Sequence, residues 1–134
     1  MVIVVAAVLM SAGAVLVSKR KPGSHLAGTW ELPGGKVEAD EDPRDALVRE
    51  LNEELGVVAE VHDIVEVTFH RYSSDNILLL FYDVSLAAGS PLPRPLDVEA
   101  VRWARLADLR DDEFPAADVP VLSKIRRRLA SHES

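Results

Sequence analysis

Three closely spaced glutamates are the residues of this chain best suited to chemistry. Glu50, Glu53 and Glu54 stand at positions i, i+3 and i+4, which share one face of a helix. Carboxylates so close repel one another, whereas a divalent cation reverses the sign of the local interaction. The chain has no cysteine, so oxygen or histidine ligands remain, and oxygen ligands favour Mg²⁺ or Mn²⁺. The spacing predicts a magnesium site suited to a nucleoside polyphosphate, and the alternative is a solvated acidic helix face.

The segment around these glutamates carries a large share of the chain's negative charge. Eight of the 22 acidic residues fall here: Glu38, Asp40, Glu41, Asp42, Asp45, Glu50, Glu53 and Glu54. Two arginines accompany them, and Arg49 is interpreted as an orienting partner for a carboxylate. The turn at residues 33–35 supplies carbonyl groups that can join a metal shell. These flanking residues favour a functional site over a solvated face.

Strands and helices must position this site, and their expected order is mixed. β-branched residues and apolar alternation predict strands at residues 2–10, 14–18, 30–32, 57–70, 76–86 and 99–105, with a break near 62–63 left open. Asp42 and Pro43 predict the start of a helix, and Gly56 predicts its end in a left-handed cap. A second helix is predicted at 119–130, after a proline-rich loop at 89–95. The fold class is therefore α/β (α+β).

Length and composition limit the possibilities further. The 134 residues, 48% of them hydrophobic, predict a single domain over 1–134. The net charge of −7 argues against a nucleic-acid duplex as partner. The uncharged start lacks the basic residues of a signal peptide, and Ser11, Ala12 and Gly13 interrupt it too early for a membrane span. We expect no membrane association and a cytoplasmic location.

The spacing around the acidic helix resembles a known signature. Gly35, five residues, Glu41, seven residues and then the run Arg49-Glu50-Leu51-Asn52-Glu53-Glu54-Leu55-Gly56-Val57 match every fixed position of the Nudix box. The resemblance to Nudix hydrolases implies an α/β/α sandwich around a mixed β-sheet, in which the box forms a loop-helix-loop that binds Mg²⁺. It also implies hydrolysis of a diphosphate linked to another moiety, by attack of water on phosphorus.

The same resemblance implies roles for individual residues. Glu53 and Glu54 would be metal ligands, Glu50 a ligand or the base that activates water, and the carbonyl of Gly34 or Gly35 a further ligand. Arg49 would act beside them, oriented together with the loop by Glu41, and Gly56 would end the helix. A further acidic ligand would be Asp97 or Glu99, between which the sequence does not choose; for both, an ordinary surface charge is the alternative.

Residues 26–38 and 112–121 resemble the MutT branch, whose members cleave nucleoside triphosphates to monophosphate and pyrophosphate. Asp118 would then lie near the base or cap the last helix, and Arg20 would lie near the phosphates or in a solvated basic patch. Trp30 and Phe81 would stack on the base or belong to the core.

The base itself stays open on this reading. An oxidised purine such as 8-oxo-dGTP is the first expectation, but the arginine common before the strand at Asn76 is replaced by Asp75. CTP or 5-methyl-dCTP is therefore the alternative. A nucleotide-sensing module without catalysis ranks lower because every box glutamate is present. The expected partner is a small nucleotide, and the expected state is a monomer or homodimer.

Overall fold

The computed structural model describes residues 1–133. Its strands are β1 (Val2–Ser11), β2 (Ala14–Lys19), β3 (Trp30–Glu31), β4 (Gly34–Lys36), β5 (Ala59–Arg71), β6 (Asn76–Leu86) and β7 (Ala100–Ala104). Its helices are α1 (Pro43–Leu55) and α2 (Val119–Glu133), with short 3₁₀ turns at Leu106–Asp108, Asp111–Glu113 and Ala116–Asp118. The predicted strands and helices are all present. β4 was not predicted as a strand, because its two glycines indicated only a turn.

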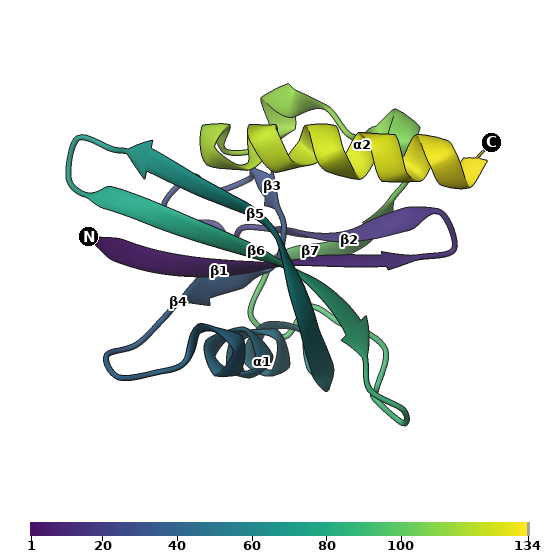
Figure 1. The fold of residues 1–134 in the computed structure, drawn as a ribbon, viewed down its shortest axis with the longest axis horizontal. Coiled ribbons are helices and arrows are strands. Elements are labelled where there is room, and N and C mark those ends of the chain that lie inside the picture. Colours follow the sequence, from purple (N-terminus) through teal and green to yellow (C-terminus); the bar gives the residue numbers. More distant parts are fainter. Residues whose placement is uncertain (134) are drawn as a thin grey trace.

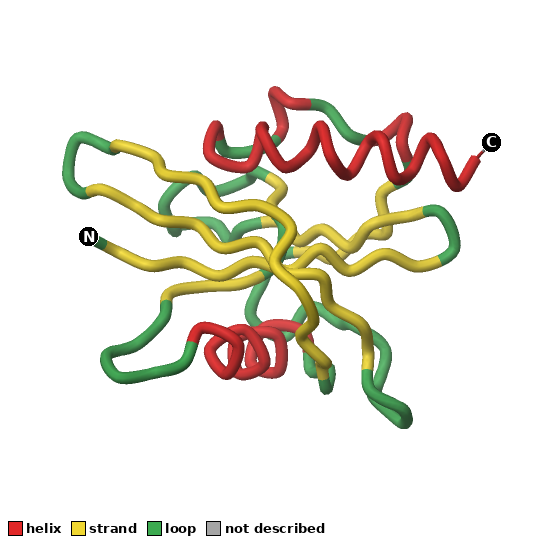
Figure 2. Tube along the Cα trace, in the orientation of Figure 1, coloured by secondary structure: helices red, strands yellow, loops and turns green. Residues whose placement is uncertain are grey.

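The strands form one mixed sheet in the order β3-β2-β1-β6-β5, with β4 beside β1 and β7 beside β2. β1 and β6 run parallel, and the other pairs are antiparallel. α1 lies on one side of this sheet and α2 on the other (Figure 1), and the strands occupy the middle layer (Figure 2). The expected α/β/α sandwich is confirmed.

Alternation along β1 divides the core into two halves. Val5, Ala7 and Leu9 pack with the apolar face of α1, whereas Ala6 and Val8 pack with the apolar face of α2. A strand whose neighbouring residues are buried on opposite faces must be apolar throughout. The uncharged N-terminus is therefore a central strand, and no helix within residues 1–133 is long and apolar enough to cross a membrane.

Both ends of α1 form as the sequence predicts. The Asp42 carboxylate accepts the Arg44 N–H at 2.8 Å, and Pro43 occupies the first turn. At the other end Gly56 adopts the left-handed conformation with φ 69°, and its N–H donates to the Asn52 carbonyl. The strand that follows is not broken at residues 62–63 but carries bulges there.

The loop before β7 closes on the C-terminal end of α1. Arg94 N–H donates to the Leu55 carbonyl at 3.1 Å, and the N–H groups of Leu96 and Asp97 both donate to the Glu54 carbonyl, at 3.0 and 3.1 Å. Carbonyls in the last turn of a helix have no partner within the helix. The loop therefore satisfies them and brings Asp97 next to the acidic face.

Candidate active site

Arg49 connects the acidic residues of the loop and the helix. Its guanidinium donates to the two Glu41 oxygens at 2.9 and 3.0 Å, and to Glu50 at 3.0 Å. It also reaches Glu53 at 3.5 Å and the Lys36 carbonyl at 3.2 Å. The hydrogen bond to Arg49 lowers the pKa of Glu41, and Glu41 in turn raises the pKa of Arg49. These contacts fix the box loop, strand β4 and helix α1 relative to one another.

The two glycines of β4 permit a close approach between sheet and helix. A Cβ atom on Gly35 would lie 2.4 Å from the carboxyl carbon of Glu50, and a Cβ atom on Gly34 would lie 1.9 Å from the Val5 carbonyl oxygen. Contacts under 3.0 Å are not tolerated without a shift. The β4 backbone therefore lies directly against the Glu50 carboxylate because Gly35 has no side chain, and against β1 because Gly34 has none.

Glu54 has an electrostatic environment that disfavours its charged form. Burial raises its pKa to about 8, and the negative charges of Glu31, Glu50 and Asp97 add to the effect. Its Oε2 atom is buried and has no hydrogen-bond partner among the described residues. The pKa of Glu50 is also raised, first by burial, against the lowering effect of Arg49. A carboxylate buried among like charges costs free energy that a cation would offset.

The donor set fits a hard divalent cation. The oxygens present are carboxylates and carbonyls, which suit Mg²⁺ or Mn²⁺ rather than a soft metal. The Glu54 Oε2 atom, which has no hydrogen-bond partner among the described residues, is available as a metal ligand. Within residues 1–133 no three acidic or histidine side chains are already gathered closely enough to hold an ion. Arg49 instead engages Glu50 and Glu53. The residues therefore match the ion chemically, with Glu50 and Glu53 paired to Arg49 and Glu54 unpaired.

The structure places the two candidates for a further acidic ligand differently. Asp97 is held by its N–H against the Glu54 carbonyl, its charge contributes to the raised pKa of Glu54, and its carboxylate pairs with Lys21. Glu99 instead donates its N–H to the Lys19 carbonyl at 2.9 Å and lies 3.9 Å from the Lys19 ammonium. Asp97 is therefore the better placed of the two.

A cavity of about 840 Å³ extends from this acidic face across the sheet. Its floor is apolar and consists of Val2, Val4, Ile77 and Leu79 from β1 and β6. Gly34, Gly35, Glu31, Glu50 and Glu54 line the acidic end. Arg20, His25 and Leu26 contribute one wall, and the hairpin residues Tyr72, Ser73, Ser74 and Asp75 with Pro115, Ala117 and Asp118 contribute the other. The cavity thus has a charged end and an apolar end, as a nucleotide has.

Asp118 is a buried acid at the apolar end. Its exposed fraction is 5%, and its carboxylate accepts the Leu32 N–H at 3.4 Å. Burial raises its pKa to about 7, and the charge of Glu31 contributes in the same direction. The carboxylate thus meets the backbone of Leu32, the residue that follows β3.

Two cavity residues were not predicted from the sequence. Glu31 pairs with Arg20 at 3.1 Å, and its charge acts on both Glu54 and Asp118; burial raises its own pKa. An acid flanked by apolar residues just before the box glycines was an available signal for it. Tyr72 lines the cavity and lies close enough to Asp118 for that charge to raise its pKa, after burial. No sequence signal marked Tyr72, because it lies in a hairpin turn.

The aromatic residues predicted to stack on a base lie elsewhere. Phe81 is 0% exposed and belongs to the core beneath α2, so it has no surface to offer, and its predicted stacking role is wrong. Trp30 packs on the same core, and the Arg102 guanidinium lies 4.3 Å from its ring centre. Neither lines the cavity. Arg20 does line it, and its Nε donates to the His25 carbonyl at 2.5 Å.

Comparison with known proteins agrees with this geometry. The sequence matches the NUDIX domain over residues 1–125, and the chain belongs to the Nudix family. It is a MutT-like Nudix hydrolase. The putative 8-oxo-dGTP diphosphatase 2 of Mycobacterium tuberculosis is 41% identical over 132 residues, which is 95% of this chain and 89% of that protein. The CTP pyrophosphohydrolase of Escherichia coli K12 is 37% identical over 122 residues, covering 91% of this chain and 89% of that one.

The fold also resembles that of a solved structure. The solution structure of the E. coli ORF135 protein superposes with a TM-score of 0.81 at 34% identity, covering 98% of this chain and 92% of that one. The fold of this chain is therefore that of a solved protein of similar size.

Proposed function

We propose that this protein is a Mg²⁺-dependent nucleoside triphosphate pyrophosphohydrolase, with Mn²⁺ as an alternative ion, that releases a nucleoside monophosphate and pyrophosphate. One observation carries the proposal: a single cavity joins the carboxylates Glu50 and Glu54 at one end to the buried acid Asp118 at the other. A triphosphate at the acidic end would place its base over the apolar floor. The cavity volume lies within the range of small-ligand sites.

The chain's own residues divide the reaction between them. A bound divalent cation would supply charge neutralisation on the phosphate oxygens and a water of lowered pKa. Glu53, Glu54 and the Gly34 or Gly35 carbonyl would hold the cation, and Asp97 is the further ligand favoured by position. Glu50 accepts the proton of the attacking water in this scheme, because burial already raises its proton affinity.

Positioning falls to residues outside the carboxylate cluster. Arg49 keeps Glu50 and Glu53 oriented toward one side of α1. Arg20, on the wall of the cavity near Glu31, would meet the phosphates. Tyr72 replaces Trp30 and Phe81 as the aromatic residue that stacks on the base, because it is the one of the three that lines the cavity. Base stacking on an aromatic ring typically contributes about 1–3 kcal/mol.

Asp118 would set the preference among bases. With a pKa raised to about 7, it donates a hydrogen bond when protonated and accepts one when ionised. The protonated form suits an acceptor on an oxidised purine such as 8-oxo-dGTP, and the ionised form suits the amino group of cytosine. The relatives include both an 8-oxo-dGTP diphosphatase and a CTP pyrophosphohydrolase. We propose the oxidised purine first and CTP or 5-methyl-dCTP second. The second is kept because the acidic Asp75, rather than an arginine, lines the cavity.

The test is a steady-state screen of the purified protein with Mg²⁺ against 8-oxo-dGTP, dGTP, CTP, dCTP and 5-methyl-dCTP. Pyrophosphate should appear as the product, and kcat/KM should be highest for 8-oxo-dGTP. A preference for cytosine nucleotides would select the second assignment. Phosphate in place of pyrophosphate, or no turnover of any of the five, would contradict the proposal. Because its proposed substrates are free nucleotides, we expect this protein in the cytoplasm.

A further inference from the structure

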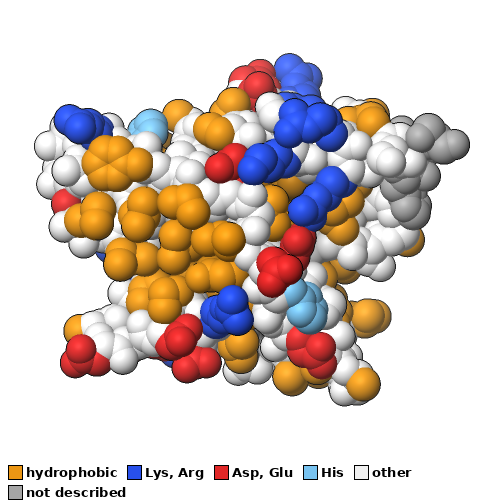
Figure 3. All heavy atoms as spheres, in the orientation of Figure 1, with side chains coloured by type: hydrophobic (Ala, Val, Ile, Leu, Met, Phe, Trp, Pro, Cys, Tyr) orange, Lys and Arg blue, Asp and Glu red, His pale blue; other side chains and the backbone are white. Residues whose placement is uncertain are grey.

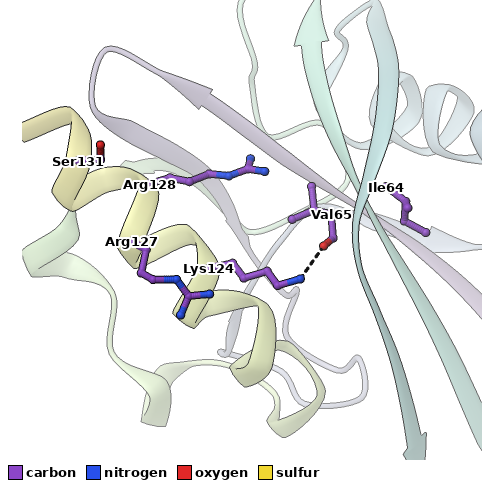
Figure 4. Close-up of a pocket in the computed structure, with 6 residues that line it drawn as sticks. All are labelled: Ile64, Val65, Lys124, Arg127, Arg128 and Ser131. Carbon is purple, nitrogen blue, oxygen red and sulfur yellow. Dashed lines mark hydrogen bonds between the residues drawn. The ribbon is translucent and has the colours of Figure 1, made fainter.

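Strand β5 forms the outer edge of the sheet and is long for an edge, with 13 residues against about 5–6 in an average strand. Side chains protect part of this edge. Lys124 of α2 donates to the Val65 carbonyl at 2.9 Å (Figure 4), and the Glu66 carboxylate accepts the Val67 N–H at 3.2 Å. Because hydrogen-bonding direction alternates along a strand, the backbone of Phe69 faces outward as that of Val67 does.

The last residues of β5 lie beyond this protection. The strand projects past the start of α2 (Figure 1), and among residues 1–133 no further strand pairs with its outer side. Proline and lysine, which commonly blunt edges, do not occur between residues 59 and 71. The bulges of β5 lie between Val61 and Glu66, so the residues after Glu66 form a regular edge, which is a template for another strand.

Apolar side chains on the same part of the sheet are also exposed. Val67 and Phe69 are 49% and 48% exposed, and they lie opposite Leu80 and Leu78 of β6 on the face that α1 covers. α1 leaves this half of the face open, and Figure 3 shows apolar side chains gathered over it. Soluble monomers rarely expose large contiguous apolar patches. The unpaired backbone and the apolar patch coincide, so a protein strand rather than water suits this edge.

We propose that β5 pairs with β5 of a second copy, antiparallel about a two-fold axis at Thr68, to form a homodimer with one continuous sheet. In this register Val67 lies opposite the partner's Phe69, which places apolar side chains together on the α1 face. Glu66 lies opposite the partner's His70 on the other face, an acceptor against a donor. A two-fold interface must be self-complementary, and residues 66–70 meet that condition. In the dimer, the Val67 N–H would donate to the carbonyl of the partner's Phe69 instead of to its present acceptor, the Glu66 carboxylate.

Charge favours a second copy at this edge over the acidic face of α1. The chain carries a net charge of −7, concentrated on the box loop and α1, so most approaches of two copies are repulsive. Residues 66–71 of the edge instead carry one acid, Glu66, which pairs with Lys124 at 3.2 Å, and one base, Arg71, so this part of β5 has no surplus of acid. Two copies can therefore meet here without opposing their acidic faces.

A single-cysteine variant tests the register, because the chain has no cysteine of its own. On the axis, Thr68 and the partner's Thr68 would form a non-hydrogen-bonded pair with Cα atoms about 4.5 Å apart, which is within disulfide range. T68C should form a covalent dimer under mild oxidation. L92C, at a loop residue that is 81% exposed, is the matched control and should stay monomeric. Cross-linking of T68C no faster than that of L92C would overturn the proposal.

Sedimentation velocity over a concentration series tests the association itself. Wild type should shift from monomer to dimer as concentration rises. F69T should raise the dimer dissociation constant by ~10-fold or more, since both copies lose apolar contact, and L92T should leave it unchanged. Retained nucleotide hydrolysis by F69T shows that the variant is folded. A wild-type protein that stays monomeric throughout, or a dimer untouched by F69T, would contradict the proposed interface.

Discussion

Gly35 lies so close to Glu50 that one added methyl group would collide with the carboxylate, at 2.4 Å from its carboxyl carbon. The backbone of β4 and the acidic face of α1 therefore form one surface. The neighbouring Gly34 is equally constrained, but by the backbone of Val5 at 1.9 Å rather than by a side chain. The two glycines thus separate an effect on the site from an effect on the fold.

G35A should therefore impair activity more than stability. The Glu50 side chain can rotate away from the new methyl group, which displaces it from the cation site, so we expect kcat to fall by ~10²-fold with a small change in Tm. G34A is the contrasting variant, and it should destabilise the fold by ~3 kcal/mol or more because backbone cannot yield. Thermal melts and kcat measurements on both variants check this, and equal destabilisation by the two would contradict it.

E53Q and E54Q should each lower turnover by at least ~10²-fold at saturating Mg²⁺, because each removes a charge that holds the cation in the transition state. Circular dichroism should show an intact fold in both. E60Q, at an exposed position on β5, is the control and should retain wild-type turnover. Near-wild-type rates in both box variants would refute the roles assigned to these glutamates.

Stability without divalent cations should fall as pH rises. The pKa of Glu54 is raised from 4.5 to about 8 in the folded protein, so between these values the native state retains a proton that the unfolded chain has lost. Tm should decline over this interval and level off above it. E54Q should flatten the decline, and Mg²⁺ should raise Tm most at the alkaline end. A Tm that increases from pH 5 to pH 8 in EDTA would be inconsistent with a buried, unpaired Glu54.

D118N and D118A should change base preference more than stability. If protonated Asp118 donates to an oxidised purine, kcat/KM for 8-oxo-dGTP falls as pH rises through about 7, while D118N, which keeps a donor at all pH values, gives a flatter profile. D118A should lose discrimination between purine and pyrimidine nucleotides. The measurement is kcat/KM on 8-oxo-dGTP and CTP from pH 6 to 9. An equal loss on every nucleotide would point to a structural role instead.

Y72A should weaken binding of all nucleotides by ~10-fold through KM, with little change in kcat, because stacking acts alike on ground and transition states. Y72F should retain most of the affinity. F81L serves as the comparison: it should lower Tm and leave KM unchanged, since Phe81 is fully buried. A KM for Y72A equal to that of wild type would contradict the stacking role proposed for Tyr72.

The sequence predicted what depends on local spacing. Glu50, Glu53 and Glu54 needed only helical periodicity, and the caps at Asp42 and Gly56 needed only local backbone preferences. The strands at residues 2–10 and 14–18 needed only their β-branched and apolar residues. These features reside within a single segment, so one segment sufficed to recognise them.

The base end of the cavity could not be predicted in this way. Asp118 meets Leu32 across 86 positions of sequence, and Tyr72 reaches the same space from a hairpin turn. Phe81 and Tyr72 are both aromatic, and only the register of β6 against β1 decides that the first is core. Contacts of this kind depend on tertiary packing, which propensity does not encode.

The parallel pairing of β1 with β6, in which Val2 lies beside Ile77, has a consequence for synthesis. During synthesis β1 is made long before β6, so the contacts with β2, β4 and α1 can form first while the β6 side of β1 stays unpaired. β1 therefore stays incompletely paired and prone to aggregation until β6 has been made, and slow folding is expected from such distant contacts. Chaperone dependence during expression would be a property of the topology rather than of any single residue.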